Sequence, residues 1–411
     1  MKIIYVFLSL MFISLAGLSQ NKTEEKPSET KLDFYGYINY EGIFDSHEST
    51  TSRYSDLYFY PVEKAEGTEN AQLDMLSLNS RVGVKLTGMN ALGANVLGVI
   101  EGDFFGTGES YKNMVRMRHA YMKLKWDKAA LTMGQFWHPM FGPDVFPRVL
   151  AFGAAAVYNP LNRAPQIRFD YNIIPNLRLT LAALEHGYHF SKGPEGLAER
   201  AQRNSAKPDV QFQLMYGQKT GFATGITAGY MWLEPREENQ DGTINENQLG
   251  TYNANWFARF KTGPLTLQTK VSYGQNMSQF VMLGGYGRLL EDIGTNNFNY
   301  TPMQVYSAWF EAFYQVNEPW QVGVFAGISG NLGTEKKVDP DFIYARSKNI
   351  KEVVRISPRI SYSVQKLRFG LEYSYNLAQY GVNGTQDEYY VYDKTTDAIN
   401  HRVLFTAKYT F

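Results

Sequence analysis

Hydrophobic and polar residues alternate along most of this chain, and the alternation is clear at its carboxyl terminus. Val403, Phe405, Tyr409 and Phe411 share one parity, whereas the residues between them are mostly polar, Lys408 among them. An extended chain sends successive side chains to opposite faces, so this pattern predicts a strand with one apolar and one polar face. The strand ends on an aromatic residue.

The same period of two recurs throughout the chain and predicts sixteen strands. They are expected near residues 33–44, 78–87, 95–104, 114–126, 130–136, 164–171, 176–186, 208–218, 221–233, 251–261, 265–275, 303–316, 320–331, 352–364, 367–377 and 401–411.

The connections between these strands alternate in length. The short ones lie near 87–93, 127–129, 172–175, 219–220, 262–264, 317–319 and 365–366. The long ones lie near 45–74, 105–113, 137–163, 187–207, 234–250, 276–302, 332–351 and 378–400. Strict interleaving of short and long connections is typical of a transmembrane barrel with short periplasmic turns and long outer loops. We therefore predict an all-β fold, a sixteen-stranded antiparallel transmembrane β-barrel over residues 32–411.

The amino-terminal segment has the features of an export signal. Lys2 precedes an apolar run from Ile3 to Leu15, and small residues at Gly17 and Ser19 suit cleavage before Gln20. A buried helix or a retained anchor is the alternative, but the run is short for a bilayer span. We predict a signal peptide over residues 1–19 and a flexible polar leader over 20–31.

Composition excludes several classes of protein. The chain has 40 basic and 40 acidic residues, and this balance argues against nucleic acid as a partner. Cysteine is absent, so no disulfide framework is available. After the signal no segment is long and apolar enough for a transmembrane helix, so a membrane role requires a closed barrel. Outer-membrane lipid is then an expected partner.

The polar faces of the predicted strands carry more arginine than carboxylate, and these faces line the lumen of a barrel. The expected pore-lining residues are Arg81, Lys123, Glu101, Asp103, Arg259, Arg355 and Arg359. An arginine-rich lumen would favour small hydrophilic anions such as small carboxylates. The alternative is that arginine and carboxylate side chains pair across strands and only rigidify the wall.

One segment breaks the alternation. Arg116 and Arg118 share a parity with outward residues, whereas Lys123 and Lys125 have inward parity. One extra residue near His119 would bring all four cations to the same side, so a β-bulge is predicted there.

The third long connection, 137–163, differs from the others because it is rich in apolar and small residues. A loop exposed to water should be polar, so this one is expected to pack inside the barrel and narrow the channel. Whether it narrows or fully plugs the lumen is left open by the sequence.

The stretch Met114–Trp126, followed by Leu131–Met140, resembles the region before the third loop of Gram-negative porins, especially the DcaP-like porins and their Bacteroidetes relatives. The resemblance implies a homotrimer of sixteen-stranded barrels in the outer membrane that passes small, often anionic, solutes. It also implies a constriction in which Asp144, Arg148 and Arg163 on the loop face Arg116, Arg118 and Arg168 on the wall.

The same resemblance places His138 at the root of the loop, where a packed, hydrogen-bonded histidine is the favoured interpretation. The last strand is similar to the terminal strand of outer-membrane barrels, in which the assembly machinery reads a final aromatic residue, here Phe411.

Catalytic and metal-binding patterns are absent from the sequence. There is no His-Glu-x-x-His run and no Gly-x-Ser-x-Gly elbow, and His186 and His189 have no carboxylate at metal-ligand spacing. We therefore expect no cofactor, no metal and no enzymatic activity. The alternatives are a barrel enzyme such as a lipid hydrolase, which needs a Ser/His pair on the lipid-facing rim, and a plugged surface-binding barrel.

Overall fold

In the computed structural model the described residues are 29–52, 57–65, 70–106, 111, 113–186, 193–196, 199–218 and 220–411. The predicted signal peptide and the predicted leader as far as residue 28 lie outside this part of the chain, as does His189.

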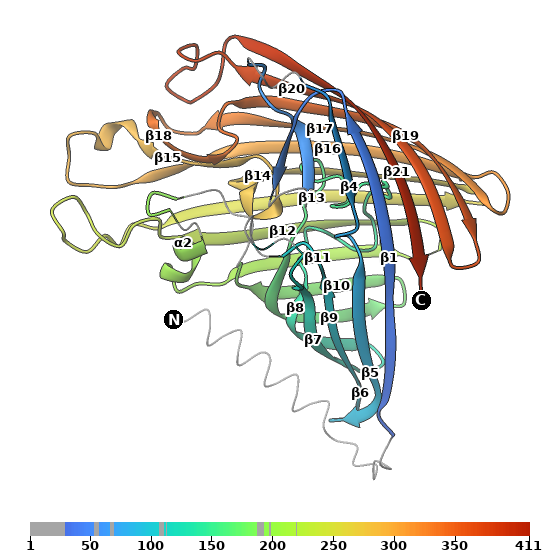
Figure 1. Cartoon of the computed structure of the whole chain (residues 1–411). Helices are drawn as coiled ribbons and strands as arrows, with labels where there is room; N and C mark the ends of the chain where they lie inside the picture. The colour runs from blue at the N-terminus through green and yellow to red at the C-terminus, as the bar shows by residue number, and fades with distance from the viewer. Residues whose placement is uncertain are drawn as a thin grey trace.

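The described residues form a closed antiparallel barrel of sixteen strands, which confirms the predicted fold (Figure 1). The wall consists of β1 (Lys31–Asp45), β4 (Gln72–Leu76), β5 (Arg81–Ala91), β6 (Ala94–Asp103), β7 (Arg116–Lys125), β8 (Ala129–Trp137), β9 (Arg163–Ile174), β10 (Leu177–Leu184), β11 (Asp209–Gly217), β12 (Ala223–Leu233), β13 (Leu249–Thr262), β14 (Leu265–Gln275), β16 (Tyr300–Gln315), β17 (Trp320–Thr334), β19 (Ile350–Val364), β20 (Leu367–Gly381) and β21 (Thr395–Thr410). Both β4 and β5 pair with β1, so the two together occupy one position in the wall.

The first and last strands close the barrel. β1 pairs antiparallel with β21 from Tyr37 opposite Thr410 to Asp45 opposite Arg402. The Phe411 amide donates to the Gly36 carbonyl oxygen at 3.1 Å, so pairing continues to the last residue. Among the described residues, closure leaves the strands of the wall without an unpaired edge, a requirement for strands in lipid.

Seven short turns lie at one end of the barrel and the long connections lie at the other, as predicted. Several long connections contain elements of their own, where the sequence predicted only loops: β2 (Ser49–Ser52), β3 (Leu57–Pro61), α2 (Glu199–Asn204), η2 (Met277–Phe280), β15 (Gly284–Leu289), η3 (Leu290–Asp292) and β18 (Val338–Arg346). β15 pairs with β16 and β18, and this extension projects beyond the wall at the long-loop end (Figure 1). Of the helices in the described residues, none is long and apolar enough to cross a membrane.

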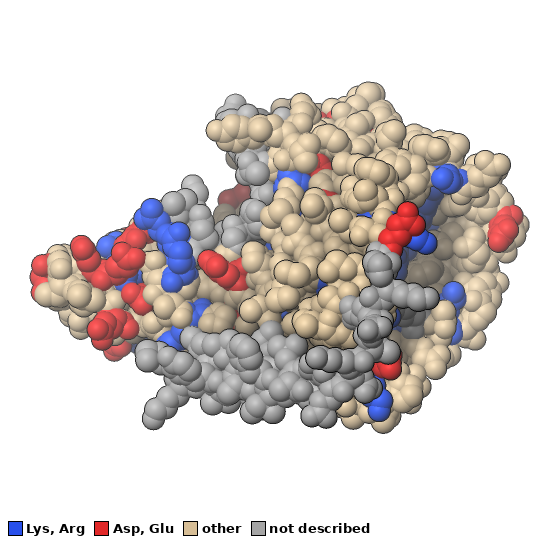
Figure 2. Space-filling model, turned by 90° about the horizontal axis from the view of Figure 1, so that it is seen from below, with Lys and Arg blue, Asp and Glu red and all other residues tan. Residues whose placement is uncertain are grey.

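The alternation predicted from the sequence separates the two faces of the wall. On β21, Val403 and Phe405 are exposed on the outside, whereas Arg402 and Leu404 are buried on the inside. The visible wall in Figure 2 has a broad area without charged side chains, and Lys, Arg, Asp and Glu gather at the projecting end. An apolar outer band with a polar interior suits a barrel embedded in lipid.

The predicted bulge on β7 is present. Glu101 pairs with His119 and the next residue of β6, Gly102, pairs with Met117, so Arg118 is the extra residue. This irregularity turns Arg118 toward the lumen together with Arg116, since both side chains contact carboxylates of β6.

Candidate functional site

The connection between β8 and β9, residues 138–162, folds into the barrel and is called the inner loop below. Its side chains Met140, Val145 and Tyr158 are fully buried. The Tyr158 ring packs edge-on against Phe325 of β17, with ring centroids 6.0 Å apart. The apolar composition of the loop is explained by this packing, because these side chains lie against lumenal residues and not in bulk water.

Side chains of the wall also bind the backbone of the inner loop. The donors are long polar side chains of β11, β13 and β14, and their bonds to loop carbonyl oxygens measure 2.6–3.0 Å: Gln213 to Pro139, Asn255 to Met140, Lys270 to Phe141, Arg259 to Asp144 and Gln268 to Phe146. Each bond satisfies a buried carbonyl group, so the first half of the loop is fixed against one side of the barrel.

Two carboxylates hold the tip of the inner loop. The backbone amide of Arg148 donates to Glu311 Oε1 at 2.9 Å, and that of Leu150 donates to Glu372 Oε2 at 2.8 Å. Both carboxylates are almost completely buried on the lumenal face. The tip is therefore fixed by charge-assisted hydrogen bonds, which are stronger than neutral ones.

A second segment, Met277–Leu283, also turns into the barrel, and all of its residues are fully buried. Its carbonyl oxygens accept hydrogen bonds from the inner loop: Phe280 from the Leu161 amide at 2.8 Å and Gln279 from Asn162 Nδ2 at 2.6 Å. This inward turn differs from the sequence pattern, which predicts only a long outer connection near 276–302.

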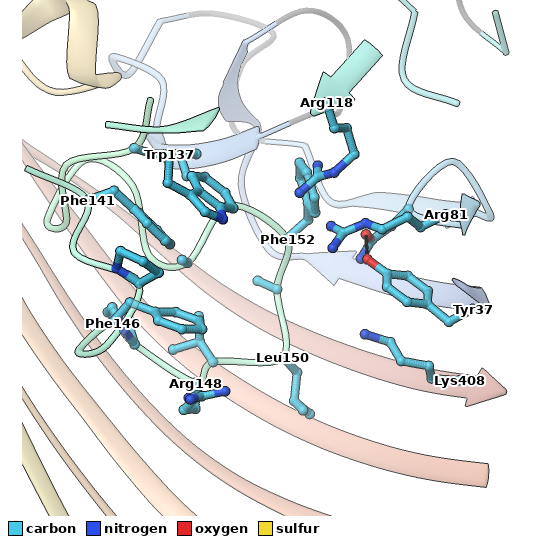
Figure 3. A pocket seen from close by; sticks show the side chains of 18 of the residues that line it. Tyr37, Arg81, Arg118, Trp137, Phe141, Phe146, Arg148, Leu150, Phe152 and Lys408 are labelled. Atoms are coloured by element: carbon cyan, nitrogen blue, oxygen red, sulfur yellow. Dashed lines mark hydrogen bonds between the residues drawn. The ribbon is translucent and has the colours of Figure 1, made fainter. Parts of the chain in front are cut away.

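A cavity of about 360 Å³ remains between the tip of the inner loop and the opposite wall. Figure 3 shows Phe146 and Leu150 on the loop side, and Tyr37, Arg81 and Lys408 on the wall side. One side of this constriction is thus largely apolar, and the other carries hydrogen-bond donors.

Six cations line the cavity, namely Arg81, Arg118, Arg148, Arg163, Arg368 and Lys408, and no carboxylate does so among the described residues. Two of the six lie close to Glu101 of β6. Arg118 Nε is 2.8 Å and Arg81 Nε is 3.5 Å from its Oε1 atom. Their charges are therefore partly neutralised.

The other four cations have no carboxylate within 4.0 Å in the described part of the chain. Their neighbours are aromatic rings and a hydroxyl group: Phe146 at 4.3 Å for Arg148, Trp137 at 5.0 Å for Arg163, Tyr37 at 4.2 Å for Lys408, and Ser361 Oγ at 3.1 Å for Arg368. Aromatic faces attract cations without cancelling their charge. The constriction therefore carries an excess of positive charge.

Comparison with known proteins agrees with this architecture. The family model described as DcaP outer membrane protein matches residues 13–214. The crystal structure of the outer membrane channel DcaP of Acinetobacter baumannii superposes with a TM-score of 0.70 at 15% identity, covering 93% of this chain and 97% of that one. The chain therefore resembles DcaP outer membrane proteins, and it is a barrel of the Gram-negative outer membrane.

Other solved structures share the fold of this barrel. The trimer form of OmpT from Vibrio cholerae has a TM-score of 0.56 at 12% identity, with 93% of this chain and 99% of that one covered. OmpF of Salmonella typhi in complex with daunomycin has a TM-score of 0.57 at 12% identity, with 93% and 98% covered. No curated protein sequence matches the chain.

The residues predicted for the constriction of the DcaP-like barrel fall into separate groups. Arg118, Arg148 and Arg163 line one cavity. Arg116 does not line it, because its guanidinium group makes two bonds of 2.9 Å to Asp103. Arg118 Nη1 binds the same carboxylate at 2.7 Å.

Asp144 and Arg168 are also placed differently from the prediction. Asp144 pairs with Arg178 of β10 and not with the predicted arginines. Arg168 pairs with Asp170 at 2.9 Å, and Lys123 Nζ lies 3.9 Å from that carboxylate. Both groups lie outside the cavity, because each side chain points to its ion-pair partner on the wall.

Three predicted pore-lining arginines support the inner loop. Arg259 binds the Asp144 carbonyl oxygen, as described above, whereas Arg359 Nη2 is 2.7 Å from Glu311 and Arg355 Nη2 is 2.6 Å from Glu372. Arg359 and Arg355 thus neutralise the two carboxylates that hold the loop tip. Arg368 and Lys408 were not among the predicted site residues, although both lie on polar faces of their strands, which was the available signal.

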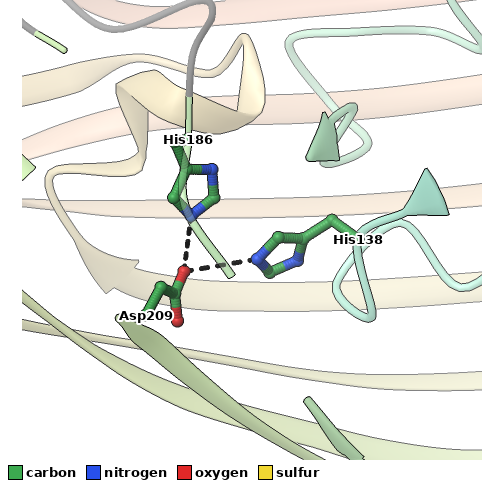
Figure 4. Close-up of side chains that lie close together, drawn as sticks. All are labelled: His138, His186 and Asp209. Atoms are coloured by element: carbon green, nitrogen blue, oxygen red, sulfur yellow. Dashed lines mark hydrogen bonds and ion pairs between the residues drawn. The ribbon is translucent and has the colours of Figure 1, made fainter. Parts of the chain in front are cut away.

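His138 lies at the root of the inner loop, as predicted, and belongs to a buried cluster with His186 and Asp209 (Figure 4). Its Nε2 atom is 3.3 Å and His186 Nε2 is 2.6 Å from Asp209 Oδ2. Three potential ligand atoms lie within 4.8 Å of one another, an arrangement that the sequence could not reveal because the residues are far apart in the chain.

The hydrogen bonds at the Nδ1 atoms of His138 and His186 indicate that both rings donate hydrogen bonds to Asp209 and argue against a metal site. The Met140 amide donates to His138 Nδ1 at 3.1 Å, and Asn162 Nδ2 lies 2.9 Å from His186 Nδ1. A ring nitrogen that accepts a bond carries no proton, so each Nε2 carries it and donates to Asp209. Metal ligation through Nε2 requires the opposite tautomer, with Nδ1 protonated.

Two further histidines have partners that do not suit hydrolysis. His401 Nδ1 lies 2.7 Å from the Tyr373 hydroxyl group, and His119 Nδ1 lies 3.4 Å from the Gln135 carbonyl oxygen. Neither bond pairs a serine nucleophile with its base.

Proposed function

We propose that the protein is a passive channel for small hydrophilic solutes with a preference for anions such as small carboxylates, and that it is not an enzyme. The observation that supports this best is the set of Arg148, Arg163, Arg368 and Lys408, which line the constriction without a carboxylate partner among the described residues. Such a set attracts anions and repels cations beside the inner loop.

The size of the effect follows from simple electrostatics. A unit charge 4–8 Å from a permeating ion in water changes its energy by about 0.5–1 kcal/mol, which is roughly a two- to fivefold change in local concentration. Several unpaired cations therefore suffice for a clear anion preference, while exposure to water keeps binding weak enough for release.

The proposal includes a homotrimer, in keeping with the trimer form of the Vibrio cholerae OmpT structure. It also includes export with a signal peptide cleaved near Ser19 and Gln20, and insertion by the barrel assembly machinery, which would recognise the strand that ends at Phe411. The solutes and the outer-membrane lipid are then the only other partners.

The test is the reversal potential of single channels in a planar bilayer with a salt gradient. The wild type should conduct in steps of three and prefer anions. Replacing two cations, Arg368→Ala with Lys408→Ala, should lower the ratio of anion to cation permeability about two- to fivefold for each charge removed.

The matched control is Lys85→Ala, which removes a lumenal cation outside the cavity; its ammonium group lies 4.7 Å from the Tyr35 ring. The control should change selectivity much less. An unchanged reversal potential in the double variant would contradict the proposed selectivity. The absence of conductance from correctly folded wild-type protein would instead favour the plugged surface-binding barrel, and lipid hydrolysis would favour the enzyme.

A further inference from the structure

The outer surface of the wall has a recess at β8, β9 and β10, near the end that carries α2. Met133 pairs with Ile167, and Ile167 pairs with Ala183, so their side chains form one row across three strands. The small residues Gly134 and Ala183 leave the surface hollow, and the recess has a volume of about 740 Å³.

This row faces outward from the barrel. Its neighbours in sequence, Thr132 and Arg168, point into the lumen, where the first is fully buried and the second pairs with Asp170. Ile167 itself is 42% exposed. In an outer-membrane barrel an outward apolar row contacts lipid, and the long-loop end faces the cell exterior.

Charged side chains lie at the rim of the recess. Arg203 and Lys207, in and just after α2, are exposed and line it, together with the exposed carboxylate Glu185. Lys207 Nζ also bonds to Gln248 Oε1 at 2.5 Å. Within the described ranges no carboxylate lies within 4.0 Å of either cation, so the rim carries a net positive charge.

An apolar floor below two cations is complementary to a lipid that has acyl chains and an anionic head. We propose that this recess binds a phosphate-bearing lipid of the outer leaflet, with an acyl chain over Met133, Ile167 and Ala183 and the phosphate at Arg203 and Lys207. The same residues would orient the barrel at the outer boundary of the membrane, as basic residues at lipid head groups do.

The experiment measures lipid retained by the purified full-length barrel with native mass spectrometry in detergent, with lipid A added as the probe. Wild-type protein should retain lipid A, and Arg203→Ala with Lys207→Ala should lower the bound fraction on the order of tenfold. A second variant, Ala183→Leu, fills the hollow without changing charge and should also lower retention.

The matched control is Lys348→Ala with Lys394→Ala, which removes two exposed lysines from other connections at the same end. It should retain lipid A as the wild type does. Equal retention by the Arg203/Lys207 variant, or equal retention of a diacylglycerol, which has acyl chains but no phosphate, by the wild type, would overturn the proposal. Channel conductance and selectivity should be the same in all variants, so this result is independent of the proposed pore function.

Discussion

The lumenal arginines of this barrel divide into two kinds according to their partners. Arg116, Arg118, Arg355 and Arg359 each lie within 3 Å of a carboxylate, and all four are nearly completely buried. Arg368 differs, since its bond is to a serine hydroxyl group. Replacing a paired arginine should mainly lower the stability of the barrel, because a buried charge that loses its partner is costly. Replacing an unpaired arginine should mainly change which solutes the channel selects.

Arg118→Ala tests this division. The change removes one of two cations from both Glu101 and Asp103, which keep Arg81 and Arg116. The free energy of unfolding should fall by about 2–3 kcal/mol, measured by urea unfolding in detergent. Selectivity should also move toward cations. Arg368→Ala is the control, since it removes the same charge without taking a cation from a carboxylate. Equal stability of the two variants would argue against the division.

The burial of His138 predicts that the stability of the folded barrel depends on pH. Burial lowers the pKa of His138 to about 4 from its ordinary value near 6.5. Between these values the unfolded chain binds a proton that the folded barrel does not, so stability should fall as pH drops from about 6.5 to 4. The difference between the two pKa values of His138 corresponds to roughly 3 kcal/mol in the free energy of unfolding.

His138→Gln is the matching variant. It removes the titrating group while retaining a side chain that can donate to Asp209, so urea unfolding should depend less steeply on pH between 4 and 6.5 than it does in the wild type. The same slope in both proteins would show that other groups dominate acid destabilisation.

At the scale of elements, the inner loop is held along one side of the barrel and leaves the cavity on the other. Its carbonyl oxygens meet amides and cations of β11, β13 and β14, and its tip amides meet Glu311 and Glu372. The segment Met277–Leu283 fills the remaining space next to it. A loop with so many satisfied backbone groups is expected to keep a fixed position on the timescale of solute passage.

Glu311→Gln should loosen the tip of this loop. The variant keeps the size of the side chain but loses the ion pair with Arg359 and part of the bond to the Arg148 amide. We expect the free energy of local opening of the loop tip to fall by about 2 kcal/mol, so the tip should spend roughly thirtyfold more time detached from the wall. This should be seen as excess noise in the single-channel current.

Glu352→Gln provides the comparison for that measurement. Glu352 accepts a bond from the Tyr306 hydroxyl group and makes no hydrogen bond or ion pair with the inner loop among the described residues. The Glu352→Gln channel should show the same current noise as the wild type. Equal noise in the Glu311→Gln and Glu352→Gln channels would show that the tip of the inner loop is held by other contacts.

At the scale of the whole molecule, the barrel depends on one long-range pairing, that of β1 with β21. The pairing is reinforced inside the lumen by Asp45, whose two oxygens each lie 2.8 Å from a nitrogen of Arg402. Asn400 Nδ2 also bonds to that carboxylate, at 2.5 Å. These contacts join residues from the two ends of the sequence, so they form only when the barrel closes.

Asp45→Ala should therefore lower the stability of the closed barrel by about 3–5 kcal/mol, because Arg402 loses its partner in a buried position. The measurement is the temperature at which the folded species disappears in a heated detergent gel. Asp397→Ala, at an exposed position of the same β21 strand, should leave this temperature unchanged. A similar loss in both variants would contradict a role for the closing pair.

Local patterns in the sequence were sufficient for the wall and for part of the constriction. Alternation of period two specified the strands, and the parity break near Arg118 specified the bulge, because side-chain direction in a strand depends only on position along the chain. The apolar composition of residues 137–163 predicted an inward loop, because such residues are unfavourable in water.

The sequence by itself thus determined a closed barrel, its two faces and the loop that enters it. The tertiary structure decided which charges stay unpaired, since Arg116 pairs with Asp103 on the neighbouring strand, whereas Arg368 and Lys408 have no carboxylate within 4.0 Å in the described part of the chain. It also decided the contact of His138 with Asp209 and the inward turn of Met277–Leu283. These features depend on distances between residues that are remote in sequence, and the period of a strand carries no information about them.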